Sequence, residues 1–239
     1  MKSRMIVFAS LVGLALASSH ALADGNKNKG FTVTPFTFIG APGDCGPTAG
    51  SNIVTSSWLT GLGLPDDGSS NTAPANTDPH NGLLLSKNGL TSDCSAAGAS
   101  VTKVKGITLT ELGFDVRNGS HCSGGAPRFN VDASDGFHFV GSCTNGTLTP
   151  APQDPTAWTR ARFDPTNPAQ FFPPLTPGAT IKSISIIFDE GTDTAGGMAG
   201  LAVIDNIDIN GVLVPSGPSN PGNGKGDEGG GKPHREGGD

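Results

Sequence analysis

Four acidic side chains toward the end of the chain have the residue type and the spacing of a cation site. They are Asp189, Glu190, Asp193 and Asp205. The first three follow the alternating apolar segment 181–188, and the fourth lies inside the next such segment, 201–209. Carboxylate and loop carbonyl oxygens are the ligands that Ca²⁺ prefers, and the glycine-rich loop between the segments allows carbonyls to approach an ion. The pattern predicts a structural calcium site. The alternative is that Asp205 accepts backbone N–H bonds and that Asp189 caps a turn.

Asp205 interrupts a row of apolar residues that recur at every second position. The apolar residues of this row are Leu201, Val203, Ile207 and Ile209. If the alternation is unbroken, all of them share one face of a strand and Asp205 lies among them. Because a buried charge needs a partner, we expect a cation, an arginine or several backbone donors beside Asp205.

A second candidate site is one face of the alternating segment 157–163. Trp158, Arg160 and Arg162 share this face if the segment is a strand. An indole ring offers a flat apolar surface for a sugar ring, so the three residues are predicted ligand contacts. Two alternatives stand beside this prediction, namely a cation–π cluster on an exposed face and burial of Trp158 in the core.

The sequence has no recognisable catalytic motif. The histidines after residue 23 are His80, His121, His138 and His234, and no H-E-x-x-H, G-x-S-x-G or P-loop pattern is present. His138 alternates with Phe137 and Phe139, so we expect it to face solvent. Carboxylates for glycoside hydrolysis would have to come from Glu111, Asp115, Asp189 or Glu190. Since no pattern distinguishes them, we predict that the protein is not an enzyme and keep a glycan hydrolase as an alternative.

The chain contains four cysteines, Cys45, Cys94, Cys122 and Cys143. An even number in an exported chain predicts two disulfides, for which three pairings exist. We favour Cys45–Cys94 and Cys122–Cys143, because the second pair brackets a predicted hairpin whose ends must meet. A zinc site of four thiolates is the alternative, although no C-x2-C spacing is present.

The first 23 residues are typical of a secretory leader. A basic start precedes the apolar stretch 5–17 and an Ala21-Leu22-Ala23 cleavage signal. This stretch is shorter than the about 20 residues that span a bilayer, so we expect export to the periplasm or the cell exterior and no membrane insertion. The whole chain has a formal net charge of −6, and removal of Lys2 and Arg4 makes it more negative. We therefore expect no nucleic-acid partner, because that requires a basic surface.

Alternating segments indicate strands, and no long stretch has a helical period. The expected strands lie at 31–39, 56–59, 82–86, 106–117, 128–131, 137–140, 157–163, 181–188 and 201–209. Pro35 marks the first as an edge strand or indicates a bulge there. The last two, with the Asn210-Gly211 turn, indicate the edge of an antiparallel sandwich. A long loop, 64–81, separates two of the early strands.

The segment LAVIDNIDING at 201–211 resembles the last strand of the jelly-roll sandwiches in galactose-binding-like and carbohydrate-binding modules. Those strands often have an aliphatic-Asp-Asn-aliphatic pattern whose Asp lies near a structural calcium, which implies this role for Asp205. The run 106–214 is similar to such sandwiches as a whole. The motifs FDVRNG, APRFNV and FDEGTD resemble those of exported bacterial proteins of unknown function. The chain has no tyrosine, a residue that sugar platforms of these modules use beside tryptophan.

These observations predict an all-β protein, an antiparallel jelly-roll β-sandwich held by disulfides. Residues 24–214 are expected to form one domain, followed by a disordered glycine-rich tail, 215–239. The predicted function is that of a non-catalytic binding module for an extracellular polysaccharide or a cell-surface glycan. A structural or surface-interaction protein without a small ligand is the alternative.

Overall fold

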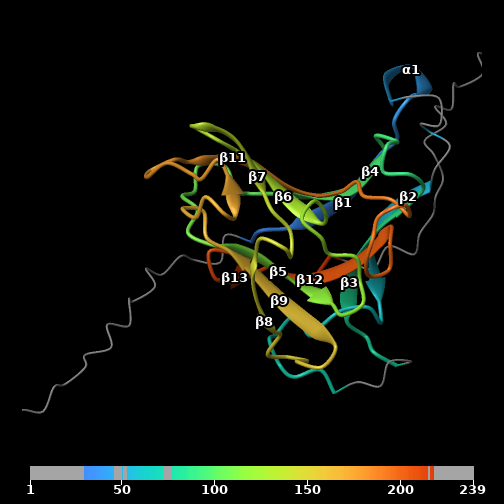
Figure 1. The fold of residues 1–239 in the computed structure, drawn as a ribbon. Coiled ribbons are helices and arrows are strands. Elements are labelled where there is room, and N and C mark those ends of the chain that lie inside the picture. Colours follow the sequence, from blue (N-terminus) through green and yellow to red (C-terminus); the bar gives the residue numbers. More distant parts are fainter. Residues whose placement is uncertain (1–29, 46–49, 51–52, 73–76, 215, 218–239) are drawn as a thin grey trace, which may run out of the picture.

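The computed structural model describes residues 30–45, 50, 53–72, 77–214 and 216–217. The predicted leader and all of the predicted tail except Ser216 and Gly217 lie outside this range. The described chain forms two antiparallel sheets that face each other, and its one helix is the short α1 (Pro42–Cys45). Figure 1 shows the two sheets as an upper and a lower layer. The predicted all-β antiparallel sandwich is confirmed, whereas its jelly-roll connectivity stays a prediction.

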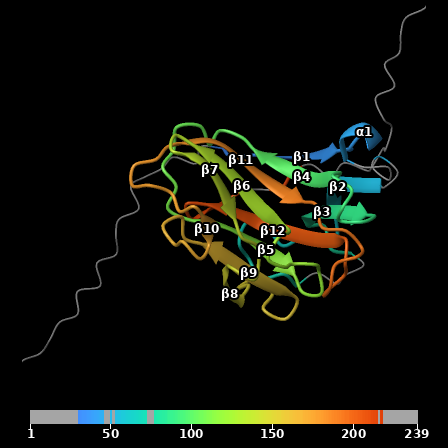
Figure 2. The same ribbon diagram turned by 45° about the horizontal axis from the view of Figure 1, so that its top comes forward.

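Six strands form the upper sheet of Figure 1. Their order across the sheet is β1 (Val33–Phe38), β4 (Ala96–Val101), β11 (Ile181–Phe188), β6 (Arg128–Ala133), β7 (Gly136–Val140) and β10 (Phe171–Phe172). As predicted from Pro35, β1 is an edge strand. Figure 2, which brings the top of the molecule forward, shows the outer face of this sheet toward the reader.

Seven strands form the second sheet. Their order is β2 (Ile53–Thr60), β3 (Asn81–Asn88), β12 (Leu201–Ile209), β5 (Leu112–Arg117), β9 (Trp158–Phe163) and β8 (Thr147–Pro150), and β13 (Val212–Leu213) pairs with β12. The expected edge position of β11 and β12 is wrong, because each lies inside a sheet, and the two sheets differ.

The segment before residue 100 contributes to both sheets. The weakly patterned 56–59 and 82–86 are parts of β2 and β3, while β4 was not expected, since its small residues show no alternation. In 106–117 only Leu112–Arg117 is a strand. Ile107 and Leu109 are still buried in the core, although they lie on irregular backbone.

The core lies between the two sheets and is built from alternate residues of their strands. At its centre the rings of Phe114, Phe129 and Phe163 lie 5.7–6.1 Å apart. The Cys122–Cys143 disulfide packs against this core, and Cys45–Cys94 forms the second disulfide. Both predicted pairings are confirmed.

A β-bulge in β12 changes which residues face the core. Asp205 lies opposite Asp115 of β5, and Asp208 lies opposite Gly113, so β12 holds one extra residue over this interval. Asn206 takes the extra position with a φ of 46°. The unbroken alternation that we expected is therefore wrong. Ala202, Ile204, Ile207 and Ile209 face the core, while Leu201, Val203, Asp205 and Asp208 lie on the outer face.

The predicted Asn210-Gly211 turn joins β12 to β13. Both turn residues have positive φ, 58° and 78°, as a two-residue hairpin loop of this sequence requires. The Asn210 Oδ1 accepts hydrogen bonds from Thr110 N at 2.7 Å and Glu111 N at 3.3 Å. The Asn210 Nδ2 donates to Thr108 O, and Gly211 N donates to the Asp208 carboxylate.

Candidate functional site

The outer face of the seven-stranded sheet is covered by the long loop after β2. A second apolar cluster forms where this loop meets the sheet, and its buried members are Leu64, Ala151, Trp158 and Val203. Trp158 is only 3% exposed, so most of its surface contacts protein. Its remaining surface lines a small pocket at the edge of this cluster.

Arg160 and Arg162 do share the outer face of β9 with Trp158, but they pair with carboxylates inside the protein. Arg160 donates two hydrogen bonds to the fully buried Asp115, at 2.9 and 3.0 Å. Arg162 crosses over Gly113 of β5 and reaches Asp208 of β12 at 3.4 Å. A Cβ atom on Gly113 would lie 2.5 Å from the Arg162 side chain, so glycine is required there. Both arginines thus form internal ion pairs, and their predicted contact with a ligand stays a prediction.

Burial dominates the electrostatics of this network. It raises the pKa of Asp208, although Arg162 acts in the opposite direction, and it lowers the pKa of Arg162. Glu111, near Arg162, also has a raised pKa. Burial is the main cause, and the negative charge of Asp208 adds to it. Asp115, which we listed among the candidate hydrolytic carboxylates, has no surface exposure and binds Arg160.

Asp205 lies beside this network and uses backbone donors. Its Oδ2 accepts a hydrogen bond from Leu64 N of the covering loop at 2.6 Å, and its Oδ1 accepts from Asn206 N at 2.7 Å. Burial raises its pKa to about 7, although these two hydrogen bonds lower it. Of the three alternatives for the partner of Asp205, namely a cation, an arginine or backbone donors, the structure shows backbone donors, two in number.

The other three predicted calcium ligands each contact a different group. Asp189 forms a bidentate pair with Arg128 at 2.6 and 2.7 Å. Glu190 accepts hydrogen bonds from Ser123 Oγ at 2.6 Å and from the His121 ring. Asp193 Oδ1 accepts from Thr91 N and Thr91 Oγ1, each at 2.7 Å, and these bonds lower its pKa.

An internal ammonium group lies where the acidic loop begins. Lys87, on the core-facing side of β3, is fully buried, and its Nζ donates to three backbone carbonyls. These are Thr91 O at 3.2 Å, Asp189 O at 2.8 Å and Asp93 O. Burial lowers the pKa of Lys87, against the attraction of nearby carboxylates. The Lys87 ammonium group thus binds one carbonyl at the start of the acidic loop, Asp189 O, and two carbonyls of the connection after β3.

Among the described residues no three His, Cys, Asp or Glu side chains are gathered in a way that could hold a metal ion. In this structure each of the four predicted ligands accepts hydrogen bonds from protein donors, and these donors lie at separate places. Calcium binding by Asp189, Glu190, Asp193 and Asp205 stays a prediction.

The expectation that His138 faces solvent is wrong. His138 is 1% exposed, and its ring nitrogens contact Pro173 O at 2.8 Å and Asp135 Oδ1 at 3.0 Å. It points inward because Phe137 and Phe139, its neighbours in β7, take the outer positions. Burial acts to raise the pKa of Asp135, but hydrogen bonds from Thr176 and His138 outweigh it and lower this pKa to about 2.

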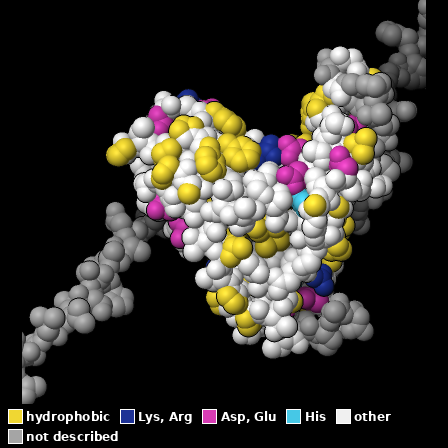
Figure 3. Space-filling model, viewed as in Figure 1, with side chains coloured by type: hydrophobic (Ala, Val, Ile, Leu, Met, Phe, Trp, Pro, Cys, Tyr) yellow, Lys and Arg dark blue, Asp and Glu magenta, His cyan; other side chains and the backbone are white. Residues whose placement is uncertain are grey.

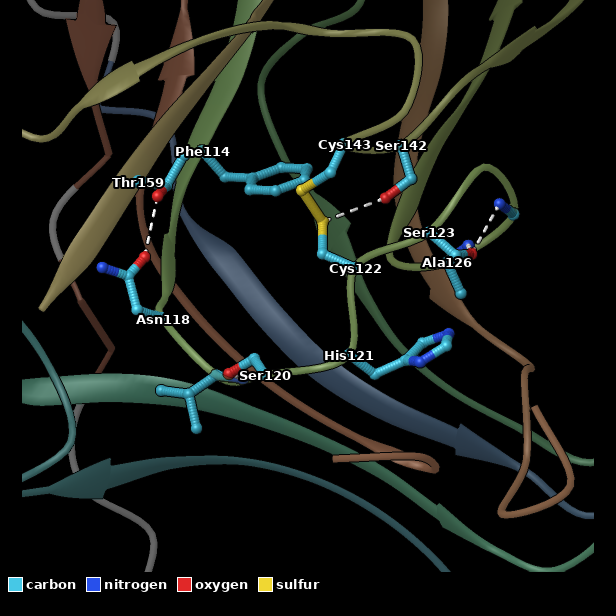
Figure 4. Close-up of a disulfide and its surroundings, with 12 residues drawn as sticks. Phe114, Asn118, Ser120, His121, Cys122, Ser123, Ala126, Ser142, Cys143 and Thr159 are labelled. Carbon is cyan, nitrogen blue, oxygen red and sulfur yellow. Dashed lines mark hydrogen bonds between the residues drawn. A yellow bond between two sulfur atoms is a disulfide. The ribbon is translucent and has the colours of Figure 1, made fainter. Parts of the chain in front are cut away.

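His121 is also buried, next to the Cys122–Cys143 disulfide. Figure 4 shows its ring pointing away from the disulfide, while the Phe114 ring points toward it. Ser123 and His121 both bind the Glu190 carboxylate, so the serine and histidine are not hydrogen-bonded to each other. This is not the arrangement of a nucleophile and its base.

The outer face of the six-stranded sheet differs, because the described chain leaves it open. One row of residues crosses all six strands in direct register and consists of Thr34, Ser100, Ser185, Asn130, Phe139 and Phe172. None of its members is charged. Within the described chain no hydrogen bond uses the side-chain hydroxyl of Thr34, Ser100 or Ser185. The two rings lie 6.3 Å apart at one end of the row.

A hollow lies above this sheet. Figure 3 shows it between a lobe that carries hydrophobic side chains and a second lobe on the side of α1. Phe137 and Phe172 are 57% and 42% exposed. Arg128 lies beside the row on the same face of β6 as Asn130, with its guanidinium 5.1 Å from the centre of the Phe139 ring and its charge paired with Asp189. The face is therefore aromatic at one end, rich in hydroxyl groups at the other, and electrically balanced.

The row was missed from the sequence, although a signal exists. The outward positions of segments 31–39 and 181–188 hold Thr and Ser where exposed strands usually carry charges. That these positions align across strands depends on the pairing register, which the sequence does not contain.

No protein-family model matches the chain, and neither the curated proteins nor the solved structures include a significant match to it. In the part of the chain that the structure describes, no helix is long and apolar enough to cross a membrane.

Proposed function

We propose that the protein is an exported, non-catalytic module that binds an extended, uncharged polysaccharide on the outer face of its six-stranded sheet. The observation that carries this proposal is the uncharged row from Thr34 to Phe172. A sugar ring presents apolar C–H faces and hydroxyl edges. Phenyl rings contact the former, while hydroxyl and amide groups exchange hydrogen bonds with the latter.

The length of the row favours a chain over a single sugar. Neighbouring strands lie about 4.8 Å apart, so a row over six strands extends roughly 24 Å. Several consecutive sugar units therefore contact it at once. The aromatic end, Phe139 and Phe172, supplies most of the apolar contact area.

Two features support a site of action outside the cytoplasm. The described chain contains two disulfides and no free cysteine, and disulfides persist in oxidising compartments. The first 23 residues have the features of a secretory leader. The acidic net charge of −6 favours a neutral polymer over a polyanion.

The test is retention of the chain without its leader on a panel of insoluble neutral polysaccharides, in calcium and in EDTA. We expect one polymer to retain the wild type. The double variant Phe139→Ala/Phe172→Ala should lose at least about tenfold in affinity, since about 1.4 kcal/mol of lost contact gives that factor. Loss of retention in EDTA would support a calcium ion in the module.

The matched control is Leu148→Ala, which removes an exposed apolar side chain from β8 of the other sheet. It should bind like the wild type, and all variants should melt at the same temperature. Equal retention of the double variant would place binding elsewhere. Absence of retention on every polymer would favour the surface-interaction alternative, for which Phe38 and Ile39, each 52% exposed, are the first residues to replace.

A further inference from the structure

One polar side chain of the uncharged row has a fixed orientation. Asn130 lies on the outer face of β6, and its Oδ1 accepts a hydrogen bond from Arg128 Nε at 3.2 Å. Because an arginine N–H only donates, the atom of Asn130 that faces Arg128 must be the oxygen. The side-chain amide nitrogen, Nδ2, is therefore left for another partner.

Arg128 is itself held by the protein. Its Nη1 and Nη2 donate to the two oxygens of Asp189 at 2.6 and 2.7 Å, and Nη1 also donates to Gly125 O at 2.9 Å. Its guanidinium lies over the Phe139 ring, 5.1 Å from the ring centre. Since its charge is paired and most of its donors are used inside the protein, Arg128 acts as a positioning residue for Asn130.

The amide nitrogen of Asn130 has an open donor. Among the described residues none accepts a hydrogen bond from Nδ2. Since every fully buried side-chain polar atom of the described residues has a partner, Nδ2 must reach the surface. The row thus presents an N–H donor of fixed direction beside hydroxyl groups, which rotate and either donate or accept.

Strand register places a different group on each side of this donor. Ser185 of β11 lies directly opposite Asn130 on one side, and Phe139 of β7 lies directly opposite it on the other. Directly opposite side chains have Cβ atoms about 5 Å apart, so a ligand group above Asn130 is within reach of both neighbours. Such a group needs an acceptor for Asn130, a polar atom for Ser185 and an apolar part for the Phe139 ring.

We infer that the row recognises the acetamido group of an N-acetylated amino sugar, and that Asn130 gives it this specificity. The inference rests on the proposed polysaccharide function. The carbonyl oxygen of the group accepts from Asn130 Nδ2, its N–H donates to Ser185 Oγ, and its methyl group packs against the Phe139 ring. A sugar hydroxyl in the same place also accepts from Nδ2, but it brings no methyl group to the ring. The ligand class is therefore a neutral polymer of acetamido sugars.

The test is a calorimetric titration of the chain without its leader, with chitohexaose and cellohexaose as ligands. These two oligosaccharides differ only in that an acetamido group replaces one hydroxyl group of each sugar unit. We expect chitohexaose to bind at least about tenfold more tightly. Insoluble chitin and purified peptidoglycan, which share the acetamido group, distinguish two sources of this chemistry. The uncharged row favours chitin, and retention on either polymer supports the inference.

Variants assign the specificity to Asn130. Asn130→Asp keeps the side-chain size and an acceptor for Arg128 but removes the N–H donor. It should bind chitohexaose at least about tenfold more weakly and lose the preference over cellohexaose. Arg128→Lys keeps the charge beside Asp189 but loses the Nε–H that orients Asn130, so it should lose part of this preference. The matched control is Asn88→Asp at the exposed end of β3 in the other sheet, which should bind like the wild type.

Two results overturn the inference without affecting the proposed function. They are equal affinities for cellohexaose and chitohexaose, and a folded Asn130→Asp variant that keeps the preference of the wild type. In both cases retention on a neutral polysaccharide can still depend on Phe139 and Phe172, which the double variant measures. If no polysaccharide is retained at all, the proposed function and this inference are both wrong, so the two failures are distinguishable.

Discussion

At the scale of single residues, buried charges with fixed partners decide much of the stability. Lys87 donates hydrogen bonds to three backbone carbonyls at the place where β3, the loop at 91–93 and the start of the acidic loop meet. A bound metal ion can also hold carbonyls together, but here the charged group is the ammonium of a side chain of β3. The position therefore links segments that are about one hundred residues apart in the sequence.

Replacement of Lys87 by methionine keeps most of the side-chain volume and removes the donor. Three carbonyls then lose a charged partner, and we expect a loss of about 3 kcal/mol or more in the free energy of unfolding. Urea denaturation measures it. The control is Lys182→Met, which breaks the exposed pair with Asp132 at 3.4 Å and should change stability by less than about 1 kcal/mol. Equal effects of both variants would contradict the role of Lys87.

Asp205 makes stability depend on pH. Its pKa is raised to about 7 in the folded protein, against about 3.9 in an unfolded chain, so the folded state holds more protons between these values. Stability must then fall as the pH rises from about 4 to about 7, and Asp208, whose pKa is also raised, acts in the same direction. Asp205→Asn should flatten this decline, by up to about 4 kcal/mol over the interval. Thermal melts over this pH range measure the effect. If the melting temperatures of the wild type and the variant change in parallel with pH, the prediction is wrong.

At the scale of elements, glycines allow the covering loop to lie close against the sheet. A Cβ atom on Gly63 would lie 2.1 Å from Asn81 O and 2.6 Å from the Asp205 carboxylate. Gly63 thereby brings Leu64 N within reach of Asp205, and it also forms part of the pocket beside Trp158.

Gly63→Ala should therefore displace the loop. We expect a loss of about 1–3 kcal/mol in the free energy of unfolding. Chemical denaturation measures this effect. Gly43→Ala in α1 is the control, because a Cβ atom there meets nothing within 4 Å. Unchanged stability of Gly63→Ala would show that the loop has room to move.

Most of the strands could be predicted because alternation is a local property of the sequence. The segments around Phe129, Phe163 and Ile186 alternate clearly and form β6, β9 and β11. β4 could not be predicted, since its first four residues, Ala96–Ala99, are small and buried on both faces and therefore show no alternation. The bulge could not be predicted either. The extra residue at Asn206 places Asp205 on the opposite face from Ile207 and Ile209, although these residues alternate in the sequence without a break.

The candidate sites were less predictable than the strands. Trp158, Arg160 and Arg162 were correctly placed on one face, but the partners of the arginines, Asp115 and Asp208, come from two other strands.

At the scale of the whole molecule, the two sheets have different outer faces. One is sealed by the loop after β2 and holds a buried charge network, whereas the other is an open surface of hydroxyl groups and rings. Substitutions on the sealed face should therefore act mainly on folding. Those on the open face should act mainly on binding.

The two disulfides stabilise this arrangement by restricting the unfolded chain. Cys45–Cys94 spans 49 residues and Cys122–Cys143 spans 21, which corresponds to about 4 and about 3 kcal/mol of loop entropy. Each paired Cys→Ala variant should lose stability of this order in urea denaturation, and the second also loses packing against the core. A pair whose removal leaves the midpoint unchanged would be redundant for folding.

The hairpin turn after β12 has a consequence for chemical ageing. An Asn-Gly dipeptide loses ammonia readily when the glycine nitrogen attacks the asparagine side-chain carbonyl. In this turn the side-chain amide of Asn210 is held by Thr110, Glu111 and Thr108, and the Gly211 nitrogen is bound to the Asp208 carboxylate. Both reacting groups are thus engaged elsewhere, so the folded protein should retain its amide at this position far longer than a peptide of the same sequence.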